Sequence, residues 1–502
     1  MWSRVCIGAA ILIVHALPVL AQTRSPPGRD EFYWLGEINK ASIVINSDEG
    51  LLDKSLAPSI AAGLNSVLQA GNEPGGSRPT LVITFEPLLI KAAGVEATLI
   101  HAGRSSQDML STMRAAIMRD EVLRLAEQLN KTTATMIRLA ERTTGTIVPN
   151  YTNGVAAQPN SYGHYLLGFV AGLRRDAERL RQAYARLDRS AMGTTVLNGT
   201  SWPLDRPRMA HYLGFAATVD NAYDAAQISP AEMPVELGAL TTSIALHTGA
   251  FVQDTMTQYA QPRPWILLRE GDGNTYVSSA MPQKRNPGLL NDTRAQASMV
   301  VTLGVGRVIS DHNIPPGMSD PKSVRDNGAV LGGATRMLQG WDRILGALVI
   351  DPARALEELN SDWTASQELA DVLMRKYQLP FRAGHHFASE VVDFAKAHDI
   401  QPSDFPYAEA QRIYTQTLQE LQLPVQPLPM SEAEFRATLD PVAIVRDRVT
   451  AGGPQPAEMT RMLAEATAAS AEQETWIGEQ HGRIDAALTS LDADFERILP
   501  KR

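Results

Sequence analysis

The feature of this sequence that most constrains its fold is a long stretch without a helix-breaking residue. Neither glycine nor proline occurs between Ser105 and Thr144. Within it, apolar side chains recur at nearly helical spacing, at Met109, Leu110, Met113, Ile117, Leu123, Leu125, Leu129, Met136, Ile137 and Leu139. A continuous helix here would be about 60 Å long. Because isolated helices are only marginally stable in water, the stretch predicts other long helices that pack along its length.

Four further stretches with helical patterns can provide these neighbours. They run from Tyr162 to about Met192, from Pro234 to Tyr259, from Leu289 to Ile309 and from Asn327 to Ile350. Glycines early in the first of them, at Gly163, Gly168 and Gly172, would allow close helix approach. The segment Thr80–Phe85 fits either a short strand or the start of a helix, and no larger strand-rich segment occurs. We therefore predict an all-α fold.

The expected helices group into three regions. An N-terminal domain spans residues 22–104, a central long-helix bundle spans 105–350, and a C-terminal helical domain spans 351–502. The last region carries helical patterns near 353–377, 406–422, 431–448 and 456–490. A chain of 502 residues is long enough for about three domains.

Residues 1–21 read as a secretory signal peptide. Arg4 precedes a mostly apolar run from Val5 to Leu20, which ends in a small-residue cleavage pattern at Ala21. An uncleaved anchor or a wrong start codon is the alternative, although the run is short for a membrane span. We expect a periplasmic or secreted protein with no membrane segment after cleavage. Cys6 is the only cysteine, so the mature chain would contain no disulfide and no thiol nucleophile.

The charge and motif content exclude several classes of function. A net charge of −9 argues against a general nucleic-acid-binding protein. No clustered histidine and acid pattern indicates a metal, and no glycine-rich loop in a suitable context indicates a nucleotide, so we predict no metal and no cofactor. An anionic substrate would depend on local cations such as Arg104, Lys284 and Arg285.

The stretch from Ser278 to Pro287 carries the strongest chemical signal. Two adjacent hydroxyls precede a Met-Pro turn, a lysine and an asparagine, and two upstream glycines would let the segment move as a loop. A serine that acts as a base needs its anion stabilised by nearby cations and backbone N–H groups. A carbanion beside a carboxylate needs donors aimed at the carboxylate oxygens, which Lys284 and Asn286 can supply.

This loop resembles the signature loop of the fumarase/aspartase superfamily, in the form found in argininosuccinate lyases and carboxymuconate cycloisomerases. The resemblance covers roughly residues 30–330. It implies that Ser278 is the base that removes a proton beta to a leaving group on a succinyl-type substrate. Lys284 and Asn286 would hold the carboxylate that becomes a dianion, and Ser279 and Met281 would contact the substrate. It also implies five long helices per subunit and a homotetramer whose active sites combine three chains.

A second segment, His101 to Asp108, is similar to the first signature region of the superfamily. Arg104, Ser105, Ser106 and Gln107 stand at the expected start of the long helix, where free N–H groups and the helix dipole favour an anion. We predict that these four residues bind substrate carboxylates. Simple helix capping by Ser105 or Ser106 is the alternative.

A third segment, Tyr151 to Pro159, resembles the second signature region. Thr152 and Gln158 match positions that contact substrate in the superfamily. Asn153 stands where many members have histidine, and Asn291 stands where many have the glutamate that pairs with it. We include Asn153 among the substrate-binding residues. The paired replacement indicates a retuned site, or an inactive one, and leaves the proton donor open.

Three groups could donate the proton to the leaving group. His101 is the candidate that we include among the catalytic residues, and a water molecule is another. His164 is also a candidate, although a structural role in a helix is favoured for it.

The segments Asn198–Arg206 and Leu213–Phe215 are close to the argininosuccinate lyase branch. That branch also has an arginine near 227–231 and a tyrosine near 314–319, both missing here, which counts against argininosuccinate itself. The leading hypothesis is therefore a carbon–nitrogen lyase that cleaves an N-substituted aspartate into fumarate and an amine. A cycloisomerase, a carbon–oxygen lyase, or a non-catalytic crystallin-like or solute-binding relative are the alternatives.

Overall fold

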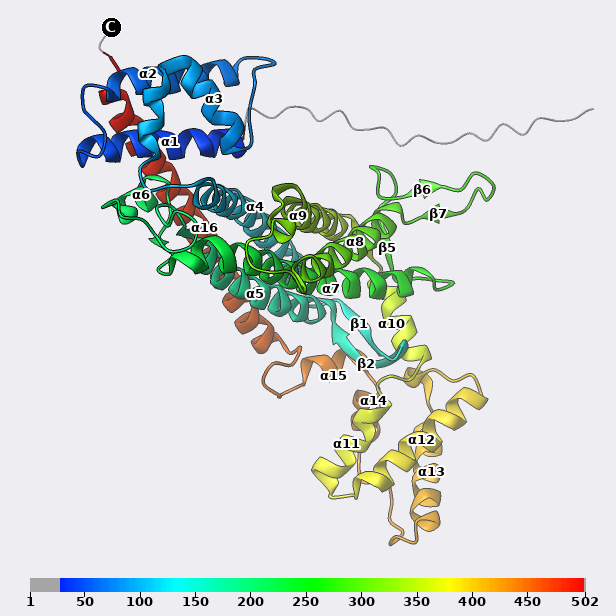
Figure 1. Cartoon of the computed structure of the whole chain (residues 1–502). Coiled ribbons are helices and arrows are strands. Elements are labelled where there is room, and N and C mark those ends of the chain that lie inside the picture. The colour runs from blue at the N-terminus through cyan, green and yellow to red at the C-terminus, as the bar shows by residue number, and fades with distance from the viewer. Residues whose placement is uncertain (1–27, 501–502) are drawn as a thin grey trace, which may run out of the picture.

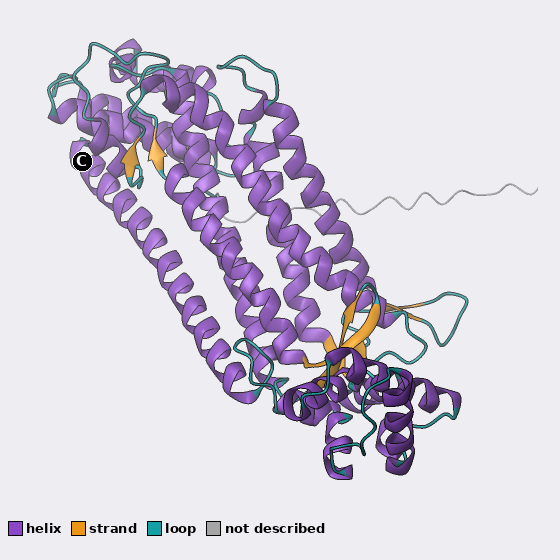
Figure 2. Ribbon diagram, turned by 90° about the horizontal axis from the view of Figure 1, so that it is seen from below, coloured by secondary structure: helices purple, strands orange, loops and turns teal. Residues whose placement is uncertain are grey.

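The computed structural model describes residues 28–500, so the predicted signal peptide lies outside the described residues. Five long helices form the centre of the molecule: α4 (Ser106–Arg142), α5 (Tyr162–Leu187), α7 (Ser229–Tyr259), α8 (Gly288–Asp311) and α9 (Val324–Ala347). They lie side by side in an elongated bundle (Figures 1 and 2). The predicted all-α fold is confirmed, and the uninterrupted stretch after Ser105 forms a single helix of 37 residues.

The longest bundle helix, α4, begins where the sequence offers a capping box. The Ser105 hydroxyl accepts a hydrogen bond from the Gln107 N–H at 3.1 Å, and Asp108 Oδ1 accepts one from the Ser105 N–H at 2.8 Å. These bonds satisfy N–H groups that have no partner within the first turn of a helix. The start of α4 is therefore fixed by its own sequence.

Glycines set how closely the bundle helices approach. A Cβ atom at Gly304 on α8 would lie 2.6 Å from the carbonyl oxygen of Gly238 on α7, well inside van der Waals contact. At the start of α5, a Cβ atom at Gly163 would lie 2.5 Å from the carbonyl oxygen of Ala140 on α4. Gly163 thus allows the close approach that was predicted, whereas Gly168 has open space around it.

The N-terminal helices pack at one end of the bundle. They are α1 (Glu31–Asp48), α2 (Ala57–Asn72), α3 (Val82–Ala93) and the 3-10 helix η1 (Val95–His101). The segment Thr80–Phe85, which fitted a strand or a helix, leads into α3 and supplies its first turn. The short helix α6 (Arg206–Tyr212) and a π-helical turn η2 (Asp224–Ile228) ahead of α7 lie in the connection between α5 and α7.

Beyond residue 351 the chain forms a second hydrophobic core. The helices of this region are α10 (Pro352–Ser361), α11 (Ser366–Tyr377), α12 (Phe381–Ala397), η4 (Pro402–Asp404), α13 (Tyr407–Glu420), α14 (Glu432–Thr438) and α15 (Pro441–Arg446). The second core contains Leu373, Phe387, Phe405 and Phe435 and is distinct from the core of the bundle.

The last helix, α16 (Pro456–Ile498), leaves this second region. Its buried residues Met459, Ile484, Leu491 and Phe495 belong to the same core as the bundle and α1. Figure 1 shows α16, in orange to red, running back along the bundle to the N-terminal helices. The predicted C-terminal domain of residues 351–502 is therefore wrong for α16, because this helix buries its apolar face on the bundle.

The strands are short and pair locally. β1 (Ile147–Thr152) and β2 (Val155–Ser161) form an antiparallel hairpin, as do β6 (Tyr276–Val277) and β7 (Arg285–Asn286). β3 (Arg189–Ser190) pairs in parallel with β4 (Ala217–Thr218), and β5 (Ile266–Leu268) pairs antiparallel with β8 (Leu348–Ile350). Both hairpins carry predicted site residues.

The helical segment Asp224–Tyr259 is long and apolar enough to span a membrane. Half of its most apolar window is buried inside the molecule, where α7 packs against α8, α5 and α9. Core helices of a bundle meet the same length and composition conditions, so this segment is weak evidence for a membrane span.

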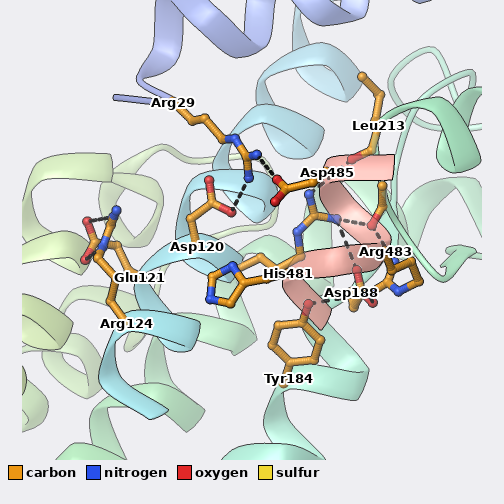
Figure 3. Close-up of polar contacts among 12 residues, drawn as sticks. Arg29, Asp120, Glu121, Arg124, Tyr184, Asp188, Leu213, His481, Arg483 and Asp485 are labelled. Carbon is orange, nitrogen blue, oxygen red and sulfur yellow. Dashed lines mark hydrogen bonds and ion pairs between the residues drawn. The ribbon is translucent and has the colours of Figure 1, made fainter. Parts of the chain in front are cut away.

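A buried arginine joins α4 to the segments around it, which include Asp188, Leu213 and Arg483 (labelled in Figure 3). Arg119 is fully buried and donates to Asp188 Oδ1 at 3.2 Å and to the carbonyl oxygens of Gly214 and Leu213 at 2.6 and 3.1 Å. Arg483 of α16 donates to the other oxygen of Asp188 and to the Gly214 carbonyl. One carboxylate and two carbonyls thus tie α4, the end of α5 and α16 together.

We expect Arg119→Met to lower the free energy of unfolding by about 3 kcal/mol, because it removes one member of a buried ion pair and leaves the Leu213 carbonyl without a donor. Denaturant or thermal unfolding measures the loss. The matched control on the same helix is Arg124→Met, since Arg124 is half exposed and its pair with Glu121 lies at the surface. That control should change the free energy of unfolding by less than about 0.5 kcal/mol, and equal effects of the two changes would contradict the assignment.

Candidate active site

The three predicted site segments of one chain lie in different parts of the molecule. Residues 101–107 stand at the start of α4, whereas the β1–β2 hairpin follows its other end (Figure 1). With 37 residues, α4 separates these two segments by about 55 Å. The β6–β7 hairpin, with Ser278 between its strands, projects beyond the bundle (Figures 1 and 2). A single chain therefore does not bring the predicted residues together.

The loop between β6 and β7 holds the Ser278 hydroxyl in a small backbone cradle. Its Oγ accepts hydrogen bonds from the N–H groups of Ala280 and Met281, at 3.4 and 3.2 Å. The Ser278 N–H donates to the Lys284 carbonyl at 3.2 Å, and the Lys284 N–H donates to the Met281 carbonyl at 3.1 Å. Two N–H donors aimed at one hydroxyl oxygen favour its anion.

The neighbouring polar groups of this loop divide into anchors and free groups. Asn286 Nδ2 donates to the Tyr276 carbonyl at 3.3 Å, and Arg285 pairs with Glu270 at 2.9 Å. The ammonium group of Lys284 makes no hydrogen bond or ion pair with any described residue, and Lys284, Ser279 and Met281 are exposed. Lys284 is therefore available to an anion, while Arg285 fixes the hairpin.

The charged residues around the start of α4 form hydrogen bonds within the protein. The Arg104 guanidinium is buried and donates to Ser42 Oγ and Asn39 Oδ1, each at 2.8 Å, and its burial lowers its pKa to about 10. Asp108 Oδ2 accepts from the N–H groups of Gly193 and Thr195, at 3.0 and 3.1 Å. Burial raises the pKa of Asp108 to about 6, against the opposing effect of the Ser105 N–H, the Arg104 charge and the Gly193 N–H. The predicted binding cation Arg104 thus faces the N-terminal helices.

The other predicted residues of this segment are more open. Ser105 caps α4 and donates to the Thr195 carbonyl, as the capping alternative anticipated. Ser106 is exposed and Gln107 is half-buried. His101 lies 3.8 Å from Glu86, and partial burial together with the charge of Arg104 lowers the pKa of its ring. Its imidazole is therefore mainly uncharged at neutral pH.

The β1–β2 hairpin carries the third set of predicted residues. Thr152 pairs with Val155 across the turn Asn153-Gly154, in which both residues have positive φ angles of 53° and 79°. This is the two-residue turn of type I′, for which Asn-Gly is the favoured sequence. Gln158 on β2 donates to Gln367 Oε1 at 2.6 Å. Asn153 therefore has a conformational reason to be asparagine, independent of any substrate contact.

Sequence reasoning missed a buried lysine. Lys322 is only 3% exposed and donates to the Ala226 carbonyl in the π-helical turn η2 at 3.2 Å, and burial lowers its pKa. No carboxylate within 4 Å pairs with it in the described part of the chain. A lone lysine in a proline-rich connection gave no signal in the sequence, because only the fold shows that it is buried.

No group of three or more histidine, cysteine or acidic side chains among the described residues could hold a metal ion.

Comparison with known proteins places the chain in a family. Residues 86–302 match the lyase family, and residues 363–446 match the C-terminal region of argininosuccinate lyases, which together make up more than half of the chain. The chain belongs to the fumarase/aspartase superfamily of lyases. This assignment agrees with the resemblance seen in the sequence of the serine loop.

Individual relatives support the assignment over most of the chain. The argininosuccinate lyase of Methanoculleus marisnigri is 27% identical over 485 residues, 92% of both chains. Argininosuccinate lyase 2 of Agrobacterium fabrum is 29% identical over 443 residues, 85% of this chain and 84% of that relative. EDDS lyase in complex with formate shares the fold with a TM-score of 0.82 and 22% identity, over 93% of this chain and 92% of that one.

Substitutions at Asn153 separate its role in the turn from the predicted substrate contact. We expect Asn153→Gly to leave the unfolding temperature nearly unchanged, and Asn153→Ala to lower the free energy of unfolding by about 1 kcal/mol, because alanine resists positive φ. Circular dichroism melting measures both. If the amide also contacts substrate, Asn153→Gly should fold normally yet bind substrate more weakly, and full activity in that variant would leave the turn as its only role.

Proposed function

We propose that this lyase cleaves the carbon–nitrogen bond of an N-substituted aspartate by beta-elimination and releases fumarate and an amine. The serine cradle carries the proposal, since it places two N–H donors on a hydroxyl that lies six residues before a free lysine. The argininosuccinate lyase relatives and the structural likeness to EDDS lyase support this chemistry.

The chemistry follows from what each group can do. Ser278, stabilised as an alkoxide by the N–H groups of Ala280 and Met281, removes the proton from the carbon beside one carboxylate. Lys284 and the amide N–H of Asn286 that is not bonded to Tyr276 hold that carboxylate while the negative charge builds on it. The carbon–nitrogen bond then breaks, its electron pair leaves with the nitrogen, which takes up a proton from His101 or a water molecule, and the new double bond completes fumarate.

We further propose that the working unit is a homotetramer with sites shared between chains. The length of α4 keeps residues 101–107 of one chain away from its own Thr152 and Gln158. Large apolar side chains that are at least half exposed gather on α7 and α8, at Leu246, Met299, Val305, Val308 and Ile309. Apolar patches of this kind mark association surfaces, and packing of these helices between copies would let the three segments meet.

Removal of the proposed base tests the chemistry. We expect Ser278→Ala to lower the rate of fumarate formation about 100-fold to 10,000-fold with little change in KM, since the hydroxyl acts in the transition state. Absorbance at about 240 nm, with a panel of N-substituted aspartates, measures the rate. Ser59→Ala, an exposed serine on α2, is the control and should retain full activity. A fully active Ser278→Ala enzyme would refute the proposed role of Ser278.

Mixing two inactive variants tests the shared site. We expect Ser278→Ala and Gln158→Leu to be nearly inactive alone, because each damages a different segment. After dissociation and reassembly of an equal mixture, about a quarter of the sites should receive both intact segments from different chains. Activity near a quarter of the wild-type value supports shared sites, whereas no recovery in a reassembled tetramer would place both segments of a site in one chain.

A further inference from the structure

A cavity of about 500 Å³ lies between the β1–β2 hairpin, α5 and α7. Tyr151 of the hairpin, Tyr162 and Tyr165 of α5, and Asp254 and Gln258 of α7 contribute polar groups to its wall. Trp265, just ahead of β5, closes one side, and the predicted substrate contacts Thr152 and Gln158 also line it. We call this space the hairpin cavity. Its volume is within the range of sites for small organic ligands.

Two buried polar side chains in the hairpin cavity have functional groups without a hydrogen-bond partner among residues 28–500. Gln258 is 3% exposed, and neither its Nε2 nor its Oε1 makes a hydrogen bond with a described residue. Tyr162 is 2% exposed, and its hydroxyl is equally without a partner in the described part of the chain. Buried polar groups almost always have hydrogen-bond partners, so these groups indicate that the cavity binds a ligand that supplies them.

The charge of the hairpin cavity is negative and uncompensated. Asp254 Oδ2 accepts a hydrogen bond from the Tyr165 hydroxyl at 2.6 Å, but no lysine, arginine or histidine lies within 4 Å of this carboxylate among residues 28–500. The nearby Glu358, by contrast, is paired with Arg354 at 3.3 Å. A partly buried carboxylate without a cation favours the binding of one.

The aromatic side chains of the hairpin cavity suit the same kind of ligand. Tyr162 and Tyr165 stack with ring centres 5.5 Å apart, and Trp265 meets Tyr162 edge-on at 6.0 Å. The Trp265 indole donates to the Tyr151 hydroxyl at 3.0 Å, which fixes the tryptophan ring. Aromatic faces attract organic cations and pack against the carbon chains that carry them.

We propose that the hairpin cavity binds an organic ammonium group, with Asp254 as its counter-ion and Gln258 Oε1 as a second acceptor. Asp254 and Gln258 are one turn apart on α7, so both can reach one ligand. The inference rests on the proposed function in one respect, since Thr152 and Gln158 beside the cavity would hold the aspartate part of the substrate. The cavity then selects the amine that the reaction releases.

Calorimetric titration of the purified protein tests the proposal without turnover. Phenethylammonium is the cationic probe, and 2-phenylethanol is its neutral counterpart of similar shape. We expect phenethylammonium to bind and 2-phenylethanol not to bind. Asp254→Asn should weaken phenethylammonium binding at least about tenfold, because a partly buried ion pair is lost. The control Glu465→Gln removes one exposed carboxylate from α16 and should leave binding unchanged. Equal binding to wild type and Asp254→Asn, equal binding of the neutral probe, or no binding at millimolar concentration would each overturn the proposal.

Two further variants separate this proposal from the proposed function. Gln258→Leu should raise the unfolding temperature of the ligand-free protein, because it removes an unpaired buried amide, and should weaken phenethylammonium binding. Ser278→Ala should keep phenethylammonium binding intact. If phenethylammonium binding depends on Asp254 but the protein has no lyase activity, the proposed function alone is wrong. If the protein is an active lyase but Asp254→Asn leaves phenethylammonium binding unchanged, the ammonium site alone is wrong.

Discussion

The length of α4 is the constraint on which the rest of this structure depends. A helix of 37 residues needs partners along its whole length, and α5, α9 and α16 supply them. The same length holds the segment before α4 and the hairpin after it at opposite ends of the bundle. The bundle thus gives each chain rigid platforms for parts of a site, and the proposed homotetramer would complete that site from neighbouring copies.

The hydrogen bonds of the predicted residues divide them into two groups. Arg104 and Ser105 use their polar groups within the protein. Arg104 donates hydrogen bonds to α1, and Ser105 caps α4. Ser278 and Lys284 lie on an exposed hairpin whose other polar groups are engaged in holding its shape. The residues with free functional groups are therefore the stronger candidates for chemistry, and the engaged residues are the stronger candidates for positioning.

Much of the fold could be predicted from the sequence because helical periodicity and the absence of breakers are local properties. They placed all five bundle helices to within a few residues, except that α7 begins at Ser229, ahead of the predicted Pro234. The core against which α16 packs could not be predicted in this way, since an apolar helix face fits a local domain as well as a distant bundle. The loop motif indicated Ser278, but the burial of Lys322 and the unpaired amide of Gln258 arise only when separate elements meet.

The return of α16 to the N-terminal helices also governs when the chain can fold. Lys40 of α1 bonds Asp492 at 2.6 Å, and Arg29, just ahead of α1, bonds Asp485 at 2.5 Å, so α1 and α16 share one surface. Such contacts between residues far apart in sequence form late, because the entropy cost of closing a long loop must be met before the contacts stabilise the fold. The packing of α1 on α16 therefore cannot be completed before α16 itself has been synthesised.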